Sequence, residues 1–370
     1  MKIDVITRHS VPNYGSLLQS YATQKAIEKL GHESEIINYT RYEERYENLA
    51  NTLIKGKKWE KNIILRCIYK VIQTPNYTRQ YKKFAEYRKN FLKETCNEYG
   101  NIDELKNNLP LADIYCSGSD QIWGKIGSSE YDEAYFLEFA RDKKCISYAS
   151  SFGKTELNNS LINKLRNMLS KYSSILVRED SAKELLKDQK FENVEQVLDP
   201  TLLLDKEEWS KLANKSCKKL PKNYVLVYQL HDNKKFDKYA KKFAKEKRMK
   251  LLRVSPSIFH ITRSGKLVYL PNQYDFLNLF KNANYVLTDS FHATVFSIIF
   301  NRNFIDILPE NNTGTRIESI LRLFKINNKI LNSFEDFNSI DYEIEWNSVN
   351  KIMKSEREKS VELLKEAIEK

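Results

Sequence analysis

Polar residues that could carry out chemistry follow the short apolar stretch Tyr285–Leu287, in the segment TDSFHATVFSIIF (Thr288–Phe300). This pattern predicts a strand that hands over to a helix, which is the crevice end of an open α/β sheet, where ligands bind. The helix start offers backbone N–H groups and a positive dipole end that suit a phosphate or carboxylate. His292 in the first turn could exchange a proton near neutral pH. The alternative is that Asp289 or Ser290 caps the helix and His292 only packs beneath a loop.

A second polar run ends the predicted strand in ADIYCSGSDQIW (residues 112–123). After Cys116 come Ser117, Gly118, Ser119, Asp120 and Gln121 in succession, which is more polarity than a turn requires. The side chains of Asp120 and Gln121 could hold the hydroxyl groups of a sugar through paired hydrogen bonds. The alternative is a well-capped loop.

Arg178 follows a third predicted strand, Ile175–Val177. An arginine at this position would point a planar, permanently charged fork toward the crevice, which suits a phosphate or carboxylate. Alternatively it forms a surface ion pair with Glu179 or Asp180, which would contribute little stability.

The elements that must position these side chains alternate between strand and helix. Residues 3–7 predict a first strand, residues 8–16 a polar loop, and the pattern from Leu17 to Gly31 a helix. Ser34–Tyr39 predicts the next strand and completes a βαβ unit, whose polar loop suits small anionic or sugar ligands. Asn13, Gly15 and Gln19 are the candidate ligand contacts there. One glycine is not a dinucleotide fingerprint, so no nucleotide cofactor is expected.

The same alternation continues to about residue 345, and 370 residues exceed what one hydrophobic core usually serves. We therefore expect two Rossmann-like, doubly wound α/β domains, at residues 1–213 and 224–345. A linker at residues 214–223 joins them, and an amphipathic helix at 349–370 packs on the domains.

Composition indicates an ordinary cytoplasmic protein, with 41% apolar and 30% charged residues. The first ten residues lack the apolar core of a signal peptide, and no apolar run is long enough to cross a bilayer. The five cysteines are widely spaced without a C-x-x-C pair or a histidine cluster, so we expect reduced thiols and no metal site.

The net charge of +12 is concentrated in one segment. Residues 55–93 hold twelve Lys or Arg against two acids, which gives +10. The segment predicts a basic helical insertion at about 53–95, built of two helices. In the second, Tyr81, Phe84, Tyr87 and Phe91 form an aromatic stripe that is typical of a core. The first, with several isoleucines among its lysines, could instead lie on an anionic membrane surface.

Seven segments in order together resemble the polysaccharide pyruvyl transferase family. They span about residues 5 to 325 and read NYGSLLQSYATQKAIEKLG, SGSDQIW, SYASSFG, VREDSAKELL, VLDPTLLL, TDSFHATVF and TRIESIL. The resemblance implies a two-domain architecture similar to glycosyltransferase B, with the active site in the cleft between the domains.

It also implies a reaction in which phosphoenolpyruvate gives its three-carbon unit to a sugar of a cell-surface polysaccharide or its polyprenyl-linked precursor. Two hydroxyl groups become a cyclic ketal and phosphate leaves, with no metal or other cofactor. Such chemistry needs an acid, a base and cations for the donor. By resemblance, His292 is the candidate acid, Asp120 orients or deprotonates the sugar hydroxyl, and Arg178 binds the donor.

One position departs from the family pattern. Characterised members carry an arginine two residues before the histidine, where this chain has Ser290. Either Arg316 or Arg302 would then have to supply the missing cation beside Ser290. The expected acceptor contacts are Asn13, Gly15, Gln19, Ser119 and Gln121.

Two other functions stay open. The first is a glycosyltransferase of the same architecture that uses a nucleotide sugar. The second is a non-enzymatic module that binds nucleic acid through residues 55–93, although aromatic residues on one side of a helix look buried rather than free for base stacking. We therefore expect no nucleic acid among the partners.

Overall fold

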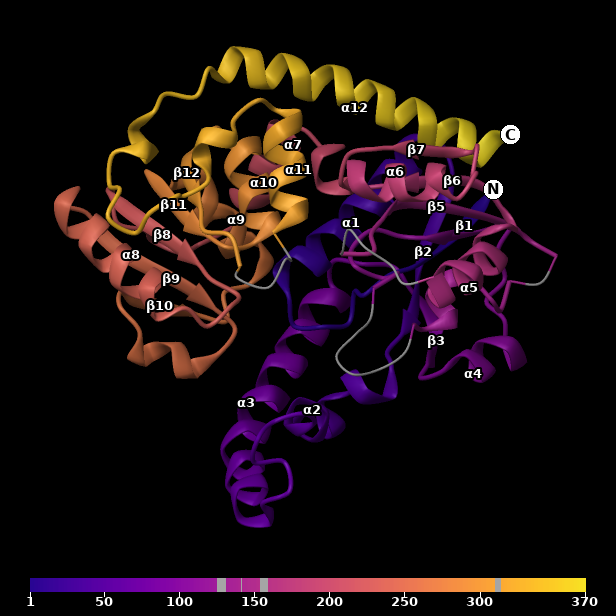
Figure 1. The fold of residues 1–370 in the computed structure, drawn as a ribbon, viewed down its shortest axis with the longest axis horizontal. Helices are drawn as coiled ribbons and strands as arrows, with labels where there is room; N and C mark the ends of the chain where they lie inside the picture. The colour runs from indigo at the N-terminus through magenta and orange to yellow at the C-terminus, as the bar shows by residue number, and fades with distance from the viewer. Residues whose placement is uncertain (125–130, 141, 154–158, 310–313) are drawn as a thin grey trace. The chain divides into compact units, whose positions relative to one another are not determined.

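A computed structural model describes residues 1–124, 131–140, 142–153, 159–309 and 314–370 (Figure 1). The chain divides into two compact α/β units. The first unit contains Met1–Leu203 together with Lys359–Lys370, and the second contains Leu204–Glu358. Each unit is built around its own parallel sheet, as the alternating pattern predicts.

The sheet of the first unit has seven parallel strands in the order β3-β2-β1-β4-β5-β6-β7. The chain adds strands on one side of β1, then returns and adds the rest on the other side. The carboxyl ends of β1 and β4 therefore form a topological switch point, where ligands bind in such sheets. The strands are β1 Lys2–Ile6, β2 Glu33–Tyr39, β3 Glu94–Tyr99, β4 Ile114–Ser117, β5 Lys144–Ser150, β6 Tyr172–Val177 and β7 Val194–Gln196.

Helix α1 begins earlier than the sequence pattern suggested. It runs Tyr14–Lys29, because the Asn13 side chain accepts hydrogen bonds from the backbone N–H groups of Gly15 and Ser16 and so caps the first turn. The predicted loop at residues 8–16 is therefore wrong for its last three residues, which already belong to the helix. The other helices of this unit are α2 Tyr46–Ile54, α3 Ile63–Lys89, α4 Ile102–Asn107, α5 Asn159–Leu169 and α6 Asp180–Asp188.

The basic segment contains one long helix where two were predicted. Helix α3 continues through Pro75, although proline removes a backbone donor and usually ends a helix. The Tyr69 and Tyr77 hydroxyl groups lie 2.9 Å apart and form a hydrogen bond that spans the proline. Phe84 and Tyr87 are buried, so the expectation of a core stripe in this half of the segment is confirmed.

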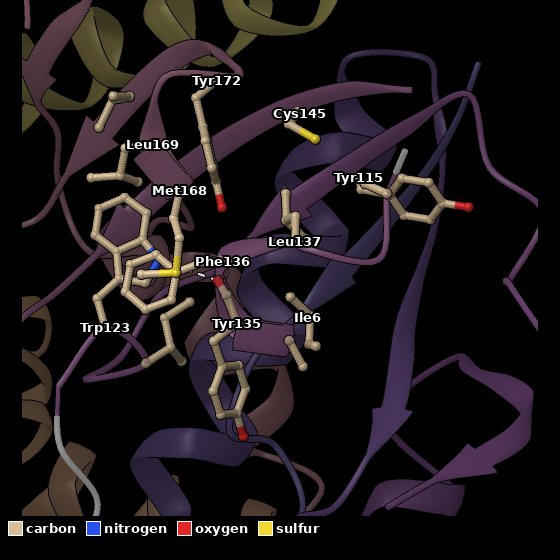
Figure 2. Packing of buried hydrophobic residues seen from close by; sticks show 14 of the residues in the cluster. Ile6, Tyr115, Trp123, Tyr135, Phe136, Leu137, Cys145, Met168, Leu169 and Tyr172 are labelled. Carbon is tan, nitrogen blue, oxygen red and sulfur yellow. Dashed lines mark hydrogen bonds between the residues drawn. The ribbon is translucent and has the colours of Figure 1, made fainter. Parts of the chain in front are cut away.

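An aromatic core fixes the polar segment that follows β4 (Figure 2). The Trp123 indole is fully buried, lies stacked on Phe136 with ring centres 5.6 Å apart, and meets the Tyr172 ring edge-on. Its Nε1–H donates to the Tyr135 carbonyl oxygen at 3.2 Å. Because the indole can move only if this core opens, the residues just before it are held against the sheet.

The sheet of the second unit has five parallel strands in the order β10-β9-β8-β11-β12, with its switch point between β8 and β11. The strands are β8 Tyr224–Tyr228, β9 Lys250–Ser255, β10 Lys266–Tyr269, β11 Tyr285–Thr288 and β12 Asn303–Asp306. The helices are α7 Lys206–Ala213, α8 Lys234–Glu246, α9 Gln273–Asn282, α10 Phe291–Ile299 and α11 Thr315–Leu323.

The division between the units falls after Leu203, ten residues before the predicted end of the first domain. Helix α7 belongs to the second unit because the buried Trp209 ring meets Phe296 edge-on at 5.1 Å. The last helix, α12 Trp346–Glu369, returns the chain to the first unit, where the Ser360 hydroxyl accepts a hydrogen bond from the Leu198 N–H. Within the described ranges, no helix is long and apolar enough to span a bilayer.

Candidate functional site

Arg178 lies just after β6 in the first unit and is the centre of a buried ion-pair cluster. Its Nη1 donates to Asp199 Oδ2 at 2.9 Å, and its Nε donates to Glu179 Oε1 at 3.0 Å. Ser119 donates its hydroxyl to the same Asp199 oxygen at 3.0 Å. All four side chains are buried. One guanidinium thus faces two carboxylates, so the cluster as a whole does not present an uncompensated positive charge.

Asp120 occupies the switch point of the first unit in an unusual backbone conformation. Its φ of 79° lies in the left-handed region, which costs a residue with a Cβ about 1 kcal/mol or more. Its Oδ2 accepts a hydrogen bond from the Ser16 hydroxyl at the start of α1, at 2.8 Å, and its Oδ1 accepts one from the Gln121 N–H at 2.9 Å. Strain of this kind at the carboxyl end of a central strand is typical of a functional residue.

The structure gives the other candidate acceptor contacts mostly internal partners. Gln19 is fully buried, and its amide donates to the Thr7 hydroxyl at 2.9 Å and to the Ser16 carbonyl oxygen at 3.1 Å. Ser119 is fully buried as well. The Asn13 side chain is engaged in capping α1. This geometry disfavours direct contact of a sugar with Gln19 or Ser119.

Gln121 is half-buried and packs over Gly153. Gly153 has a φ of 68°, and a Cβ added there would lie 2.1 Å from the Gln121 Nε2. The residue must therefore be glycine both for its backbone and for the close approach of this amide. Gly15, another predicted contact, lies buried in the first turn of α1.

A pocket of about 370 Å³ opens beside the loops that follow β1 and β2. The sequence reasoning missed it, because its walls come from four separate segments. Arg88, one of the lining residues, is held in place because it donates to the Ser10 carbonyl oxygen at 3.1 Å and to Glu94 at 2.9 Å. The lining combines hydroxyl groups, tyrosine rings and charges of both signs, which suits a polyhydroxylated ligand: Ser10, Thr40, Arg45, Tyr46, Glu47, Tyr81, Lys82, Ala85, Arg88 and Glu98.

In the second unit, His231 and Asp289 meet at the switch point between β8 and β11. His231 Nδ1 lies 3.1 Å from Asp289 Oδ2, and the same carboxylate accepts the backbone N–H groups of Leu230 at 2.7 Å and His231 at 2.9 Å. Asp289 is buried, whereas 41% of the His231 side chain is exposed. When Nδ1 carries the proton that bonds to Asp289, Nε2 is an acceptor that can take up a proton.

A buried arginine supports this turn from behind. Arg253 on β9 is fully buried and donates to Gln229 Oε1 and to Asp237 Oδ1, both at 2.7 Å. Gln229 in turn donates from Nε2 to the His231 carbonyl oxygen at 2.9 Å. The His231 backbone is therefore held on one side by Asp289 and on the other by the Arg253–Gln229 pair.

Ser290 occupies the N-cap position of α10, but its side chain makes no capping hydrogen bond. The predicted capping role of its hydroxyl is therefore not seen. His292 is the second residue of α10, is 6% exposed, and meets the Phe291 ring edge-on. Its imidazole is much less accessible than that of His231.

The two candidate replacement cations lie at opposite ends of the strands of this sheet. Arg302 immediately precedes β12, so it lies at the amino ends of the strands, away from Ser290, which follows β11. Arg316 lies in the first turn of α11, after the chain has left the carboxyl end of β12. Of the two, only Arg316 is on the side of the sheet that carries Ser290.

Asp306, at the carboxyl end of β12, is fully buried. Its Oδ1 accepts the Thr294 hydroxyl at 2.6 Å, and burial raises the pKa of this carboxyl well above its usual range. Thr294 also contacts the Ser290 carbonyl oxygen. Asp306 thus braces the first turn of α10, where Ser290 and His292 lie.

Among the described residues, no three His, Cys, Asp or Glu side chains are grouped in a way that could hold a metal ion. The family model for polysaccharide pyruvyl transferase matches residues 13–311, which is most of the chain and includes both switch points. The chain belongs to the polysaccharide pyruvyl transferase family. The family match confirms the resemblance seen in the sequence, and a search of curated proteins finds no match.

Solved structures with similar folds extend over almost the whole of this pyruvyl transferase family member. A protein from Listeria monocytogenes described as a UDP-N-acetylglucosamine 2-epimerase is 11% identical with a TM-score of 0.56, covering 96% of this chain and 91% of its own. UGT89C1 of Arabidopsis thaliana is 10% identical with a TM-score of 0.51, covering 98% of both chains. At these identities the likeness shows the fold alone, and that fold is the glycosyltransferase B type, as expected.

His231 and Arg253 belong to the candidate site in the second unit, and the sequence reasoning did not single them out. The signal for His231 was present, because QLHDN follows the apolar strand Tyr224–Tyr228 in the same way that TDSFH follows β11. Arg253 gave no such signal, since a single arginine inside a strand reads as an exposed residue. Both lie at or behind the edge where this family member carries Ser290 and His292.

Proposed function

We propose that the protein transfers the pyruvyl group of phosphoenolpyruvate to a sugar of a cell-surface polysaccharide or of its lipid-linked precursor. The proposal rests on one observation: in this member of the pyruvyl transferase family, groups that can transfer protons lie at the switch point of each sheet. These groups are Asp120 in the first unit and His231 with Asp289 in the second. A parallel sheet binds its ligands at this position.

The chemistry sets the requirements. A sugar hydroxyl adds to the central carbon of the donor while the methylene carbon takes up a proton and becomes a methyl group. Phosphate then leaves with the bonding electron pair, and a second hydroxyl of the sugar attacks the same carbon to close the ketal. The proton of the second hydroxyl leaves with phosphate, so atoms and charges balance. The enzyme must supply one proton at carbon and accept others from oxygen.

His292 and His231 are the candidate proton-transfer groups. His292, in the first turn of α10, is assigned the proton that goes to the methylene carbon. His231 is more exposed and is oriented by Asp289, so it is suited to accept a proton from a hydroxyl group. Asp120, held by Ser16, is assigned to orient or deprotonate the sugar hydroxyl.

Ser290 and Arg316 are the candidate donor contacts. The hydroxyl of Ser290 makes no capping hydrogen bond to α10. The start of the helix can therefore present this hydroxyl, together with backbone N–H groups, to an anion. Arg316 stands at the same edge of the sheet and would supply the positive charge that other family members carry at position 290. Arg178, already paired with Asp199 and Glu179, is the weaker donor candidate.

The acceptor is a glycan, and the pocket beside Ser10 and Thr40 is the candidate site for one of its sugar units. Stacking of tyrosine rings and paired hydrogen bonds from charged groups are how proteins hold sugars of this kind. A lipid-linked acceptor would require the enzyme to work at a membrane surface.

The test is thermal unfolding of the purified protein with phosphoenolpyruvate, with UDP-sugars and GDP-sugars as controls. A ligand at about one hundred times its dissociation constant adds about 2.7 kcal/mol, which shifts the transition measurably. We expect a shift with phosphoenolpyruvate that is lost in Arg316→Gln and retained in Arg302→Gln, the matched control at the opposite edge. A shift with a nucleotide sugar alone would refute pyruvyl transfer and favour a glycosyltransferase.

A further inference from the structure

Helix α3 carries one face that the first unit leaves uncovered. Positions 64, 68, 71, 75, 79 and 82 are separated by three or four residues, so they lie along one side of the helix. The first four are Ile64, Ile68, Val71 and Pro75, and the last two are Arg79 and Lys82, all of them exposed. In Figure 1, α3 runs away from the sheet of the first unit with α2 beside it.

The aliphatic part of this face is large for a surface. Ile64 is 72% exposed, Ile68 50% and Val71 75%, and Ile63, Leu65 and Ile72 beside them are exposed as well. Scattered apolar residues on a surface need no explanation, but a contiguous group marks an interaction site.

These exposed side chains are not part of the buried core of the first unit. The other side of α3 makes the packing contacts, through the buried Tyr81 and Phe84. Toward the start of α3, the Trp59 ring packs on Tyr69 with centres 5.4 Å apart, and Tyr69 bonds to Tyr77. The helix is therefore positioned by its aromatic side, and its aliphatic side is left for a partner.

The charge of the segment selects the partner. Twelve basic residues against two acidic ones between positions 55 and 93 give +10. A shallow groove on α3 extends from the aliphatic half of the face to the basic half. Its lining residues include both apolar and positively charged side chains: Lys70, Val71, Thr74, Pro75, Thr78, Arg79, Lys82 and Lys83. Two copies of this face would repel each other. Single-stranded nucleic acid would require aromatic rings on the face, and the described residues there are aliphatic.

We propose that this face of α3 docks on an anionic lipid bilayer. The aliphatic half enters the boundary between headgroups and acyl chains, and Arg79, Lys82 and Lys83 contact lipid phosphates. The helix lies on the bilayer and does not cross it. Docking rests only on the exposed face and its charge, so it does not depend on which reaction the protein catalyses.

The test is flotation of the full chain with vesicles of phosphatidylcholine alone or with one quarter phosphatidylglycerol. We expect binding to the anionic vesicles only. Two triple variants should each lose it: Ile64→Ser, Ile68→Ser and Val71→Ser on the aliphatic half, and Arg79→Gln, Lys82→Gln and Lys83→Gln on the basic half. At about fivefold per surface cation, the second variant should bind about 100-fold more weakly.

The matched control removes the same charge elsewhere. Lys241→Gln, Lys242→Gln and Lys245→Gln on the exposed side of α8 should leave binding unchanged. Because all the replaced side chains are exposed, the thermal unfolding of every variant should match that of the wild type. Equal recovery with neutral vesicles, an equal loss in the α8 control, or full binding by the aliphatic variant would each overturn the proposal. So would α3-dependent retention on RNA without vesicle binding.

A fluorophore attached to Cys67, which lies among the aliphatic residues of this face, provides a second test of membrane insertion. It lies three residues after Ile64 and four before Val71, and its side chain is exposed. With Cys96 and Cys217 replaced by serine, a polarity-sensitive fluorophore on Cys67 should shift to shorter wavelength when anionic vesicles are added. An unchanged spectrum under conditions where the protein floats would contradict insertion of this face.

Discussion

Replacing Arg178 by methionine should destabilise the protein strongly, because the change leaves two carboxylates buried without their cation. Asp199 and Glu179 are 1% and 3% exposed, so neither can recover hydration without opening the site. Removing one partner of a buried ion pair typically costs about 3–5 kcal/mol. Methionine keeps most of the side-chain volume, so cavity formation adds little to this figure.

The measurement is urea-induced unfolding at pH 7.5, compared with Asp199→Asn and with the double variant. Asp199 also accepts hydrogen bonds from the Thr201 N–H at 3.0 Å and hydroxyl at 2.6 Å, which the asparagine oxygen can retain. The double variant should therefore be less destabilised than the sum of the single variants, with a coupling of about 1–3 kcal/mol. Lys183→Met is the control, since its pair with Glu195 is partly exposed and should be worth about 0–1 kcal/mol.

The same experiment separates two roles for Arg178. If Arg178→Met unfolds like the wild type but no longer responds to phosphoenolpyruvate, the structural reasoning is wrong and Arg178 is a donor contact. If stability falls as predicted and the surviving folded protein still responds to phosphoenolpyruvate, the arginine holds the sheet edge together. Additive single variants would also refute the ion-pair argument.

Three further predictions concern single carboxyl and imidazole groups. Asp4 on β1 is fully buried, and burial raises its pKa to about 7 although Lys2 lowers it, so its ionised form opposes folding. Since the folded pKa exceeds the unfolded one, Asp4→Asn should leave stability unchanged below about pH 4. It should stabilise increasingly up to pH 7, by at most about 4 kcal/mol, in calorimetric scans across that range; equal effects at pH 4 and pH 8 would contradict this. Asp120→Asn keeps the left-handed backbone and the bond to Ser16, so unfolding should change by less than about 1 kcal/mol while phosphate release falls about 100-fold or more. An active Asp120→Asn enzyme would exclude Asp120 as the base. His231→Gln should lower phosphate release about 100-fold and flatten its pH profile, yet keep the thermal shift with phosphoenolpyruvate; an unchanged profile would remove His231 from proton transfer.

The sequence predicted the repeating parts of the fold well, because buried parallel strands leave continuous apolar runs. The strands predicted at Ser34–Tyr39 and Tyr285–Leu287 each differ by one residue from the observed strands Glu33–Tyr39 and Tyr285–Thr288. Errors arose where tertiary contacts override local pattern. The Asn13 cap extended α1 toward its amino end, and packing across Pro75 kept α3 continuous.

The sequence could show where the candidate site residues lie in the sheet, but not which of their side chains contact one another. Polar residues after strands marked Asp120 and Arg178 correctly as edge residues, yet no local rule could show that Arg178 turns inward to Asp199, 21 residues away. The His231–Asp289 pair joins residues 58 positions apart, and only the sheet order places them together. Strand order is a property of the whole chain, which explains why single motifs did not contain this information.

The stacked indole of Trp123 has a kinetic consequence for the strained residue three positions before it. The backbone N–H of Trp123 donates to the Ser151 carbonyl oxygen at 3.1 Å, and the backbone N–H of Ile122 donates to the Asp120 carbonyl oxygen at 2.8 Å. A loop tethered in this way cannot fray alone, so these amides should exchange hydrogen only when the surrounding sheet opens cooperatively. Asp120 is thus held ready by the stability of the entire first unit, and heat should abolish its geometry in a single step rather than gradually.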